Sequence, residues 1–355
     1  MKRAMIAMSG GVDSSVAAYL TQKAGYDCIG ATMRLATNAE TGIPEGHSCC
    51  SLFDVEDARS VAYRLGIPYY VFNFTEDFRE KVIDRFVDAY CNGETPNPCI
   101  DCNRYLKFEK LVLRAKALEC GRIVTGHYAR IEQQPSGRYV LKKALDETKD
   151  QSYALYHLTQ AQLAHTLFPL GSLPKTEVRR IAQEQGFSNA KKHDSQDLCF
   201  VPDGDYAGAI ERYTGKRFPH GPFLDENGAV IGEHRGIIHY TVGQRKGLGF
   251  SFPEPVYVCR ICPETNAVVL GKNASLYEKT LHAEEVHWIS GEAPEHPVRL
   301  KAKIRYRQPE QPAIVTPEGE HAISVTFDLP QRAITRGQSV VLYDGDIVVG
   351  GGTIR

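Results

Sequence analysis

Three cysteines are the residues of this sequence best suited to covalent chemistry. Cys99 and Cys102 form a Cys-x-x-Cys pair, and Cys199 lies in a polar loop just before an apolar pair. Two prolines and a glycine precede Cys99, so we expect the first two cysteines at a junction between a loop and a helix. A helix N-terminus and the basic residues that follow lower the pKa of a thiol there, which makes Cys102 a candidate thiolate nucleophile.

The same cysteines allow two kinds of chemistry. Cys-x-x-Cys is the spacing of a redox pair. Together with Cys199, the pair could instead supply three thiolate ligands to an iron–sulfur cluster. A further group, His47, Cys49 and Cys50, could bind a metal, although a loop without a metal is the simpler interpretation.

A second chemical feature is the stretch from Ser9 to Ser15, which reads Ser-Gly-Gly-Val-Asp-Ser-Ser. It follows an apolar run and precedes residues of helical character. A strand, a glycine turn and a helix in this order bring backbone N–H groups together on an anion. No lysine follows the glycines and Gly-x-Gly-x-x-Gly is absent, which excludes the Walker-type loop and the dinucleotide fingerprint. The stretch therefore predicts a different phosphate loop, with a plain capped turn as the alternative.

Alternating strands and helices position this loop. Such alternation predicts a parallel sheet that is covered by helices on both faces and that binds ligands beyond the carboxyl ends of its strands, where the loop lies. The expected strands are residues 27–33, 69–74 and 122–128, and the expected helices are 54–65, 76–90, 158–168 and 176–185. Residues 129–133 and 139–143 are expected to form a hairpin.

The pattern of predicted secondary structure changes near residue 205. Short β-like runs at 237–241, 256–262 and 268–270 predict a small mixed domain, and the β-rich remainder predicts a compact barrel with a terminal hairpin at Asp344-Gly345. The fold class is therefore α/β, with a parallel-sheet domain at 1–204, a central mixed α/β domain at 205–278 and a C-terminal β-barrel at 279–355.

One segment of the expected barrel alternates basic and apolar residues. A period of two places the basic residues on one face of a strand. The basic members are Arg299, Lys301, Lys303, Arg305 and Arg307. With no acid between them, they favour phosphate contact over a merely solvated face.

Composition limits the function classes. The chain has 355 residues, ten cysteines and a formal net charge of −1, and no apolar run approaches the length of a membrane span. A cytoplasmic location is the default, and cysteines there favour reactive or metal-binding thiols over a disulfide framework. With no global positive charge, RNA binding has to come from local basic patches.

Six motifs together resemble the bacterial tRNA-specific 2-thiouridylase family, whose first motif is the loop of the ATP-pyrophosphatase superfamily. The similarity covers nearly the whole chain. The motifs are 9–15, 97–103 (Asn-Pro-Cys-Ile-Asp-Cys-Asn), 125–128 (Thr-Gly-His-Tyr), 149–153 (Lys-Asp-Gln-Ser-Tyr), 194–200 (Asp-Ser-Gln-Asp-Leu-Cys-Phe) and 243–247 (Gly-Gln-Arg-Lys-Gly).

The resemblance implies a tRNA-uridine 2-sulfurtransferase. In the family, ATP adenylates the 2-oxygen of the wobble uridine in tRNAs for glutamate, glutamine and lysine, and sulfur replaces that oxygen. The residues that it implies for ATP are Ala7, Met8, Ser9, Gly10, Gly11, Val12, Asp13, Ser14, Met33 and Gly126. Those that it implies for RNA are His127, Lys149, Asp150, Gln151, Tyr306, Arg307 and Gln338.

Roles for the cysteines also come from the resemblance. Cys199 corresponds to the persulfide-bearing cysteine and Cys102 to the nucleophile, which leaves a Cys102–Cys199 disulfide after sulfur transfer. The implied partners are tRNA and a sulfur donor, either a cysteine desulfurase or a relay protein. Asp13 could help to hold Mg²⁺. The chain departs from the family at Cys99, where many members have aspartate close to the target base, and this departure raises the possibility of a [4Fe–4S] cluster on Cys99, Cys102 and Cys199.

Two other interpretations remain open at this point. The chain could be a different ATP-pyrophosphatase, either another tRNA sulfurtransferase or an amide-forming synthetase. It could also be an RNA-binding or cluster-carrying protein without turnover.

Overall fold

The computed structural model describes residues 2–35, 52–193, 198–201, 203–249, 252 and 254–355. The candidate metal ligands His47, Cys49 and Cys50 and residues 194–197 of the motif 194–200 therefore lie outside the described residues. No described helix combines the length and the apolar character that a membrane crossing needs.

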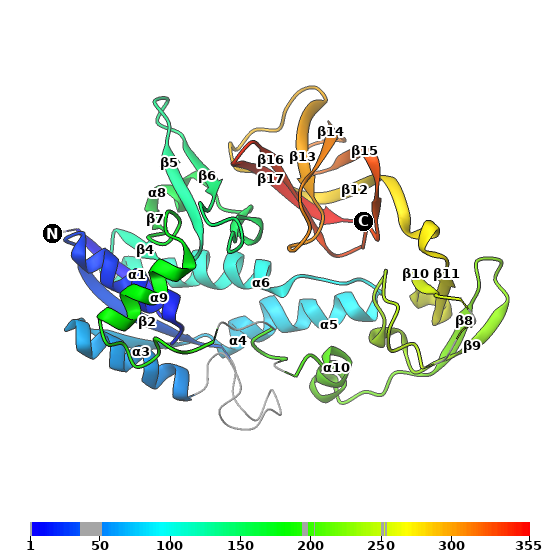
Figure 1. Ribbon diagram of the computed structural model, residues 1–355, viewed down its shortest axis with the longest axis horizontal. Coiled ribbons are helices and arrows are strands. Elements are labelled where there is room, and N and C mark those ends of the chain that lie inside the picture. The colour runs from blue at the N-terminus through cyan, green and yellow to red at the C-terminus, as the bar shows by residue number, and fades with distance from the viewer. Residues whose placement is uncertain (1, 36–51, 194–197, 202, 250–251, 253) are drawn as a thin grey trace.

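The N-terminal part is built on a parallel sheet, as the sequence predicts, and its strand order is β3-β2-β1-β4-β7 (Figure 1). Its strands are β1 (Arg3–Ala7), β2 (Asp27–Arg34), β3 (Tyr69–Asn73), β4 (Arg122–Val124) and β7 (Thr166–Leu167). Successive side chains of β1 face opposite sides, so that Ala4 and Ile6 pack in one cluster and Met5 in the other. Both faces of the sheet are thus buried.

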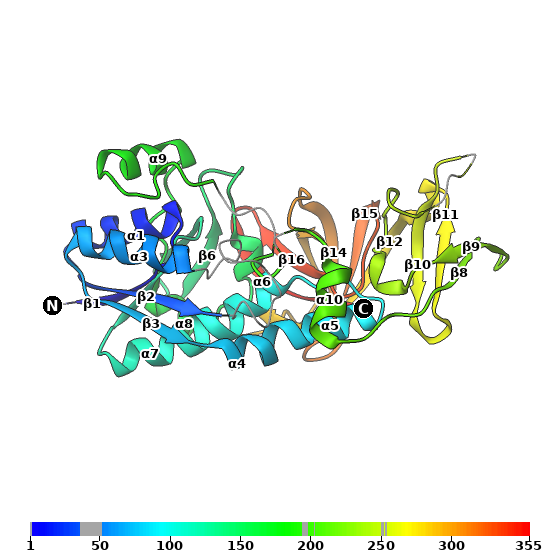
Figure 2. The same cartoon turned by 90° about the horizontal axis from the view of Figure 1, so that it is seen from below.

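Helices cover the two faces. On one face lie α1 (Val12–Lys23), α3 (Leu52–Leu65) and α9 (Lys175–Glu184), which group together in Figure 2. On the other lie α4 (Thr75–Phe78), α7 (Leu111–Ala117) and α8 (Gln160–His165). Helices α5 (Asp84–Cys91) and α6 (Pro98–Asp101) extend beyond the sheet and lie below the barrel in Figure 1. The π-helical stretch Arg79–Ile83 joins α4 to α5, and a second one, Cys102–Lys110, joins α6 to α7. We call the continuous helix from Thr75 to Cys91 the helical rod.

The helix predicted at 158–168 is wrong at its C-terminal end. The helix ends at His165, and Thr166 takes an extended conformation that begins β7. β7 then pairs with the exposed edge of β4. A β-branched residue at this point fits an added strand better than another helical turn.

The central part holds α10 (Tyr206–Thr214) and a small mixed sheet of order β10-β11-β8-β9. Its strands are β8 (Gly221–Leu224), β9 (Val230–His234), β10 (Tyr257–Cys262) and β11 (Ala267–Gly271). The strand predicted at 237–241 is wrong, because residues Ile237–His239 form a 3₁₀ helix. Ile237 and Ile238 are neighbours and both buried, which a strand with one buried face does not allow.

The C-terminal part is a closed six-stranded antiparallel barrel, which confirms the barrel prediction. Its strands are β12 (Tyr277–Trp288), β13 (Val298–Lys303), β14 (Gln311–Pro317), β15 (Ile323–Arg332), β16 (Ser339–Asp344) and β17 (Ile347–Ile354). Pairing of β12 with β17 closes the ring. In Figure 1 the barrel lies above α5 and α6 and beside the central part.

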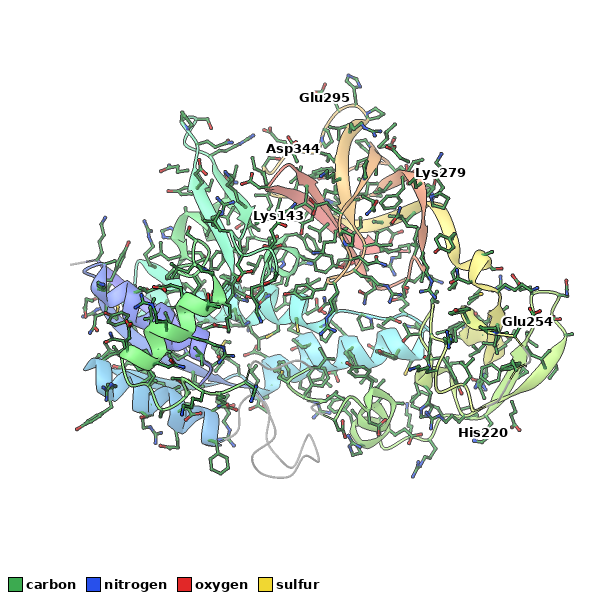
Figure 3. All side chains as sticks on the ribbon, in the orientation of Figure 1. Lys143, His220, Glu254, Lys279, Glu295 and Asp344 are labelled. Carbon is green, nitrogen blue, oxygen red and sulfur yellow. The ribbon has the colours of Figure 1, made fainter. Side chains whose placement is uncertain are left out.

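A hairpin of the N-terminal part extends the barrel sheet. Strands β5 (Ala129–Gln133) and β6 (Tyr139–Lys143) pair as predicted, and β6 also pairs with β17 through Leu141 and Val348. Arg130 and Lys142 add ion pairs to Asp346 at 2.9 and 3.3 Å. Lys143 and Asp344, labelled in Figure 3, lie on the two sides of this junction. The barrel and the parallel-sheet part are therefore joined by backbone as well as by side chains.

Candidate active site

The loop from Ser9 to Ser15 connects β1 to α1 at the carboxyl end of the sheet. Gly10 has a φ of +74°, and a Cβ atom there would lie 2.4 Å from the Asp54 carbonyl oxygen, so that glycine is required. The hydroxyl groups of Ser14 and Ser15 donate to the Gly11 carbonyl at 2.9 and 3.0 Å, which fixes the turn. The first N–H groups of a helix have no acceptor within the helix, so this loop can bind a phosphate group.

Two residues that the sequence analysis missed bind the loop and the start of α3 beside it. Asn189 Nδ2 donates to the Gly10 carbonyl and to Ser15 Oγ, both at 2.9 Å. Lys192 Nζ lies 2.7 Å from carboxylate oxygens of both Asp54 and Asp57. Neither residue is near the loop in sequence, and no local signal could have identified them.

Asp13, in the first turn of α1, has its carboxylate bound by protein groups. Lys175 Nζ donates to both of its oxygens, at 2.7 and 2.8 Å, and the Tyr128 hydroxyl donates to Oδ1 at 2.8 Å. A carboxylate neutralised in this way does not fit the role of a Mg²⁺ ligand.

The other predicted nucleotide residues surround the loop. A Cβ atom on Gly126 would lie 2.8 Å from the Ser14 nitrogen, so the chain after β4 passes directly against the first turn of α1. Met33 is partly buried near the carboxyl end of β2. The remaining members, Ala7, Met8 and Val12, form the end of β1 and the start of α1. The structure thus brings the predicted nucleotide residues together.

Cys99 and Cys102 lie at a helix start, as predicted. Asn97 is the N-cap of α6, and its Oδ1 accepts from the Cys99 N–H at 3.2 Å, with Pro98 in the first turn. Cys99 is exposed, whereas Cys102 is 9% exposed and begins the π-helical stretch. The two thiols therefore have different access to solvent.

Cys199 is brought to the same helical rod as Cys102. Its neighbour Phe200 packs edge-to-face on Phe78 and Phe86, with ring centroids 5.7 and 5.2 Å apart. Helix α6 packs against residues 79–83 of the same rod. Two segments that are about a hundred residues apart in sequence thus share one support.

A metal site on Cys99, Cys102 and Cys199 is not shown by the described part of the chain. Among the described residues, no three Cys, His, Asp or Glu side chains are placed to hold a metal ion. Cys99 faces solvent while Cys102 is buried in the apolar core.

His127, one of the predicted RNA residues, is buried. Its Nδ1 lies 2.7 Å from Thr125 Oγ1, and its ring contacts Phe108 and Phe168. Burial, with the nearby charge of Lys107, lowers the pKa of His127 well below its ordinary value, so that the ring is neutral. His127 thus connects the π-helical stretch after Cys102 with the nucleotide loop beside Gly126.

The motif 149–153 also serves the fold. Asp150 accepts hydrogen bonds from the Ala144 and Ser152 N–H groups and from the Ser152 hydroxyl, at 3.0, 3.2 and 2.7 Å. Gln151 Oε1 accepts from the Tyr128 N–H at 3.0 Å. Lys149 is partly buried. The side chains of Asp150 and Gln151 shape this turn, and their contact with RNA stays a prediction.

Tyr306 lies on the surface close to Cys99. It is 38% exposed, and its hydroxyl donates to the Asp150 carbonyl at 3.2 Å. Burial of the hydroxyl, with the charges of Asp150 and Cys99 nearby, raises the pKa of Tyr306 to about 12. Arg307 beside it is exposed. Gln338 instead donates to the Thr95 carbonyl at 2.6 Å.

The predicted basic face is only partly realised. Strand β13 ends at Lys303, so the period of two does not continue to Arg305. Arg299 pairs with Asp328 on β15 at 2.5 Å. Arg305 is turned inward, where its NH2 group donates to the Val242 and Ala333 carbonyls and to Thr335 Oγ1. The acids and carbonyls that these cations meet come from distant segments, which the local pattern does not show.

Comparison with known families divides the chain into three matched segments. The sequence model described as the tRNA methyl transferase HUP domain matches residues 2–203. The one described as the tRNA methyl transferase PRC-barrel domain matches 208–272, and the aminomethyltransferase beta-barrel domain matches 278–354.

Full-length relatives match over the whole chain. The tRNA-specific 2-thiouridylase MnmA of Clostridioides difficile is 53% identical over 100% of this chain and 98% of its own. The tRNA-specific 2-thiouridylase MnmA of Acetivibrio thermocellus is 52% identical over 100% of this chain and 99% of its own. A solved 4-thiouridine synthetase in complex with RNA and ATP aligns with 57% of this chain and 45% of that chain, at 22% identity and a TM-score of 0.37, too weakly for any argument.

Proposed function

Because this chain belongs to the tRNA-specific 2-thiouridylase family, we propose that it is a tRNA-uridine 2-sulfurtransferase that uses ATP to replace the 2-oxygen of a uridine with sulfur. The wobble uridine of tRNAs for glutamate, glutamine and lysine is the proposed target. The proposed division of the chain at 1–204, 205–278 and 279–355 gives the first part ATP and the cysteines, and gives the last part RNA contact.

One observation carries the proposal. The segment with Cys102 and the segment with Cys199 pack on the same helical rod, and His127 connects the Cys102 segment to the nucleotide loop. A uridine C2 atom held between the nucleotide loop and the cysteines would therefore be within reach of both ATP and the thiols. A different ATP-pyrophosphatase would not need two thiols at this place.

Activation is the first step. The uridine 2-oxygen attacks the α-phosphorus of ATP, pyrophosphate leaves, and the oxygen becomes part of an adenylate. The loop from Ser9 to Ser15 offers N–H groups of the first turn of α1 to the phosphates that develop charge. The Lys175 ammonium group balances the charge of the Asp13 carboxylate, so that the pair adds no net negative charge beside these phosphates.

Sulfur transfer is the second step. The outer sulfur of a Cys199 persulfide attacks C2 and AMP leaves with the former carbonyl oxygen. The Cys102 thiolate then attacks Cys199 Sγ, which breaks the bond to the delivered sulfur and releases the 2-thiouridine. Cys102 and Cys199 end as a disulfide. The two electrons that they lose reduce the transferred sulfur atom from the persulfide to the sulfide level. An external thiol has to restore them, and a sulfur donor protein has to reload Cys199.

Contact with tRNA is assigned to a surface beside Cys99. Tyr306 offers an exposed ring for stacking on an unpaired base, and Arg307 offers a cation to the backbone. Arg245 and Lys246, in the loop that Arg305 holds through Val242, are also exposed. Since tRNA is the substrate, we propose that the protein acts in the cytoplasm.

The test separates the two steps. Protein, transcript tRNA, ATP, and a cysteine desulfurase with cysteine are combined, then pyrophosphate and 2-thiouridine are measured. We expect Cys199→Ala to release pyrophosphate but form no 2-thiouridine, while the control Cys259→Ala does both. Absence of tRNA-dependent pyrophosphate release from wild-type protein would contradict the proposal and favour an RNA-binding protein without turnover.

The route of sulfur is tested with a third variant. Cys99 is exposed and has no assigned step in the persulfide route, so we expect Cys99→Ala to retain thiolation. Anaerobic purification with iron and sulfide analysis accompanies the assay. Loss of both iron and thiolation in Cys99→Ala would replace the persulfide route with a cluster route.

A further inference from the structure

The turn Arg336–Ser339 leads into β16 of the barrel. It binds the segment that leads into α6. The Thr95 N–H donates to the Arg336 carbonyl at 2.9 Å, and Gln338 Nε2 donates to the Thr95 carbonyl at 2.6 Å. Both backbone groups of Thr95 are therefore bound by the barrel. Thr95 lies two residues before Asn97, the N-cap of the helix that carries Cys99.

Ion pairs and close packing strengthen this contact. Arg336 and Arg355 each lie 3.6 Å from the Glu94 carboxylate, and the Glu94 side chain is 15% exposed. Gly337 has a φ of +83°, and a Cβ atom there would lie 2.9 Å from that of Glu94. Any side chain at Gly337 would thus push the two segments apart.

The same turn also holds the other wall of the cysteine site. Ser339 accepts the Tyr153 hydroxyl at its carbonyl, at 2.7 Å. Tyr153 belongs to the 3₁₀ helix Ser152–Leu155, against which α6 packs. Asn103 Nδ2, next to Cys102, donates to the Ala154 carbonyl of that helix at 3.0 Å. One turn of the barrel therefore fixes the chain before Cys99 and the 3₁₀ helix that contacts α6 and Asn103.

We infer that the Arg336–Ser339 turn sets the position of the cysteine helix, with Gln338 as a positioning residue. The amide of Gln338 is committed to Thr95 and acts through α6, so the barrel contributes to the rate of the chemical steps as well as to RNA contact. The part of this inference that concerns rates rests on the proposed function. Its structural part does not.

The test compares two matched substitutions. Gln338→Glu keeps the shape of the side chain but removes the donor to Thr95. Gln331→Glu is the control, because the Gln331 amide on β15 donates only to the nearby Leu329 carbonyl among the described bonds. Hydrogen exchange of backbone amides 94–103 is measured by mass spectrometry without ATP or RNA, and kcat and KM for tRNA are measured separately.

We expect Gln338→Glu to speed exchange of these amides about tenfold, the effect of losing one hydrogen bond. We also expect kcat to fall while KM for tRNA stays within twofold, with no change in Gln331→Glu. Unchanged exchange, or a raised KM with unchanged kcat, would overturn the inference and return Gln338 to direct RNA contact. Because exchange needs no substrate, it distinguishes failure of this inference from failure of the proposed activity.

Discussion

The Asp13 carboxylate lies in the first turn of α1, beside the phosphate loop, and Lys175 balances its charge. Lys175 is 9% exposed, so water cannot replace its ammonium group easily. Lys175 therefore offsets the negative charge that Asp13 would otherwise place beside the phosphates of a bound nucleotide.

We expect Lys175→Met to weaken ATP binding at least tenfold, because an unpaired carboxylate would then repel the phosphates. Lys23→Met, at the exposed end of the same helix, is the control. Isothermal calorimetry with ATP measures both variants. Equal affinities would show that Lys175 only supports the fold.

His157 is a buried residue whose two ring nitrogens have no hydrogen-bond partner among the described residues. Burial, followed by the charge of Arg104, lowers the pKa of His157 to about 3. The neutral ring stabilises the fold fully above the ordinary pKa near 6.5, and this contribution is lost as the pH falls from there toward 3.

We expect His157→Phe to change the free energy of unfolding little at pH 8. At pH 4.5 it should raise that free energy by roughly 2 to 3 kcal/mol relative to wild type. Urea unfolding at both pH values checks this, with exposed His296→Phe as the control. A constant difference between the two pH values would contradict the argument.

Local spacing predicted the loop from Ser9 to Ser15 and the cysteine helix, because a glycine turn and an N-cap depend only on neighbouring residues. The contacts of Lys175 and Gln338 were out of reach, since each joins segments more than a hundred residues apart. His127 and Asp150 are predicted to contact RNA, and this stays a prediction, because the hydrogen bonds that the structure shows for them lie within the fold.

At the scale of elements, the basic segment after β13 divides into two functions. Alternation in the sequence treats Arg305 and Arg307 alike, whereas the end of β13 at Lys303 turns one inward and leaves the other exposed. A period of two predicts a face only as long as the strand lasts.

This division can be measured. We expect Arg305→Ala to lower the free energy of unfolding by about 2 to 3 kcal/mol, because three acceptors lose their donor. Arg307→Ala should leave stability unchanged, weaken tRNA binding, and reduce the salt slope of binding by about 1. Binding titrations at several salt concentrations and denaturant unfolding separate the two. The reverse assignment of effects would refute the division.

For the whole molecule, pairing of β6 with β17 makes the barrel and the parallel-sheet part share one sheet. The single tryptophan, Trp288, lies on β12 and reports on the barrel, whereas the helical circular dichroism signal comes mainly from the N-terminal part. Unfolding of the two parts can thus be followed independently.

We expect both signals to share one midpoint in wild type, because the shared sheet couples the two parts. Val348→Ala, at a buried position of this junction, should lower the free energy of unfolding by about 1 to 2 kcal/mol. The midpoints of both signals should therefore fall together. Ile314→Ala, partly exposed on β14, is the control. Separate midpoints in wild type would show that the junction does not couple the parts.

The junction between β6 and β17 also has a consequence for synthesis on the ribosome. The hairpin leaves the ribosome some two hundred residues before β17 does, so one edge of β6 stays unpaired for as long as that stretch takes to translate. An open strand edge invites pairing with other chains, and charged residues such as Lys142 on that strand discourage it. A chain truncated before Ile347 would keep this edge open permanently, and nascent chains stalled there are the ones that chaperones would need to shield.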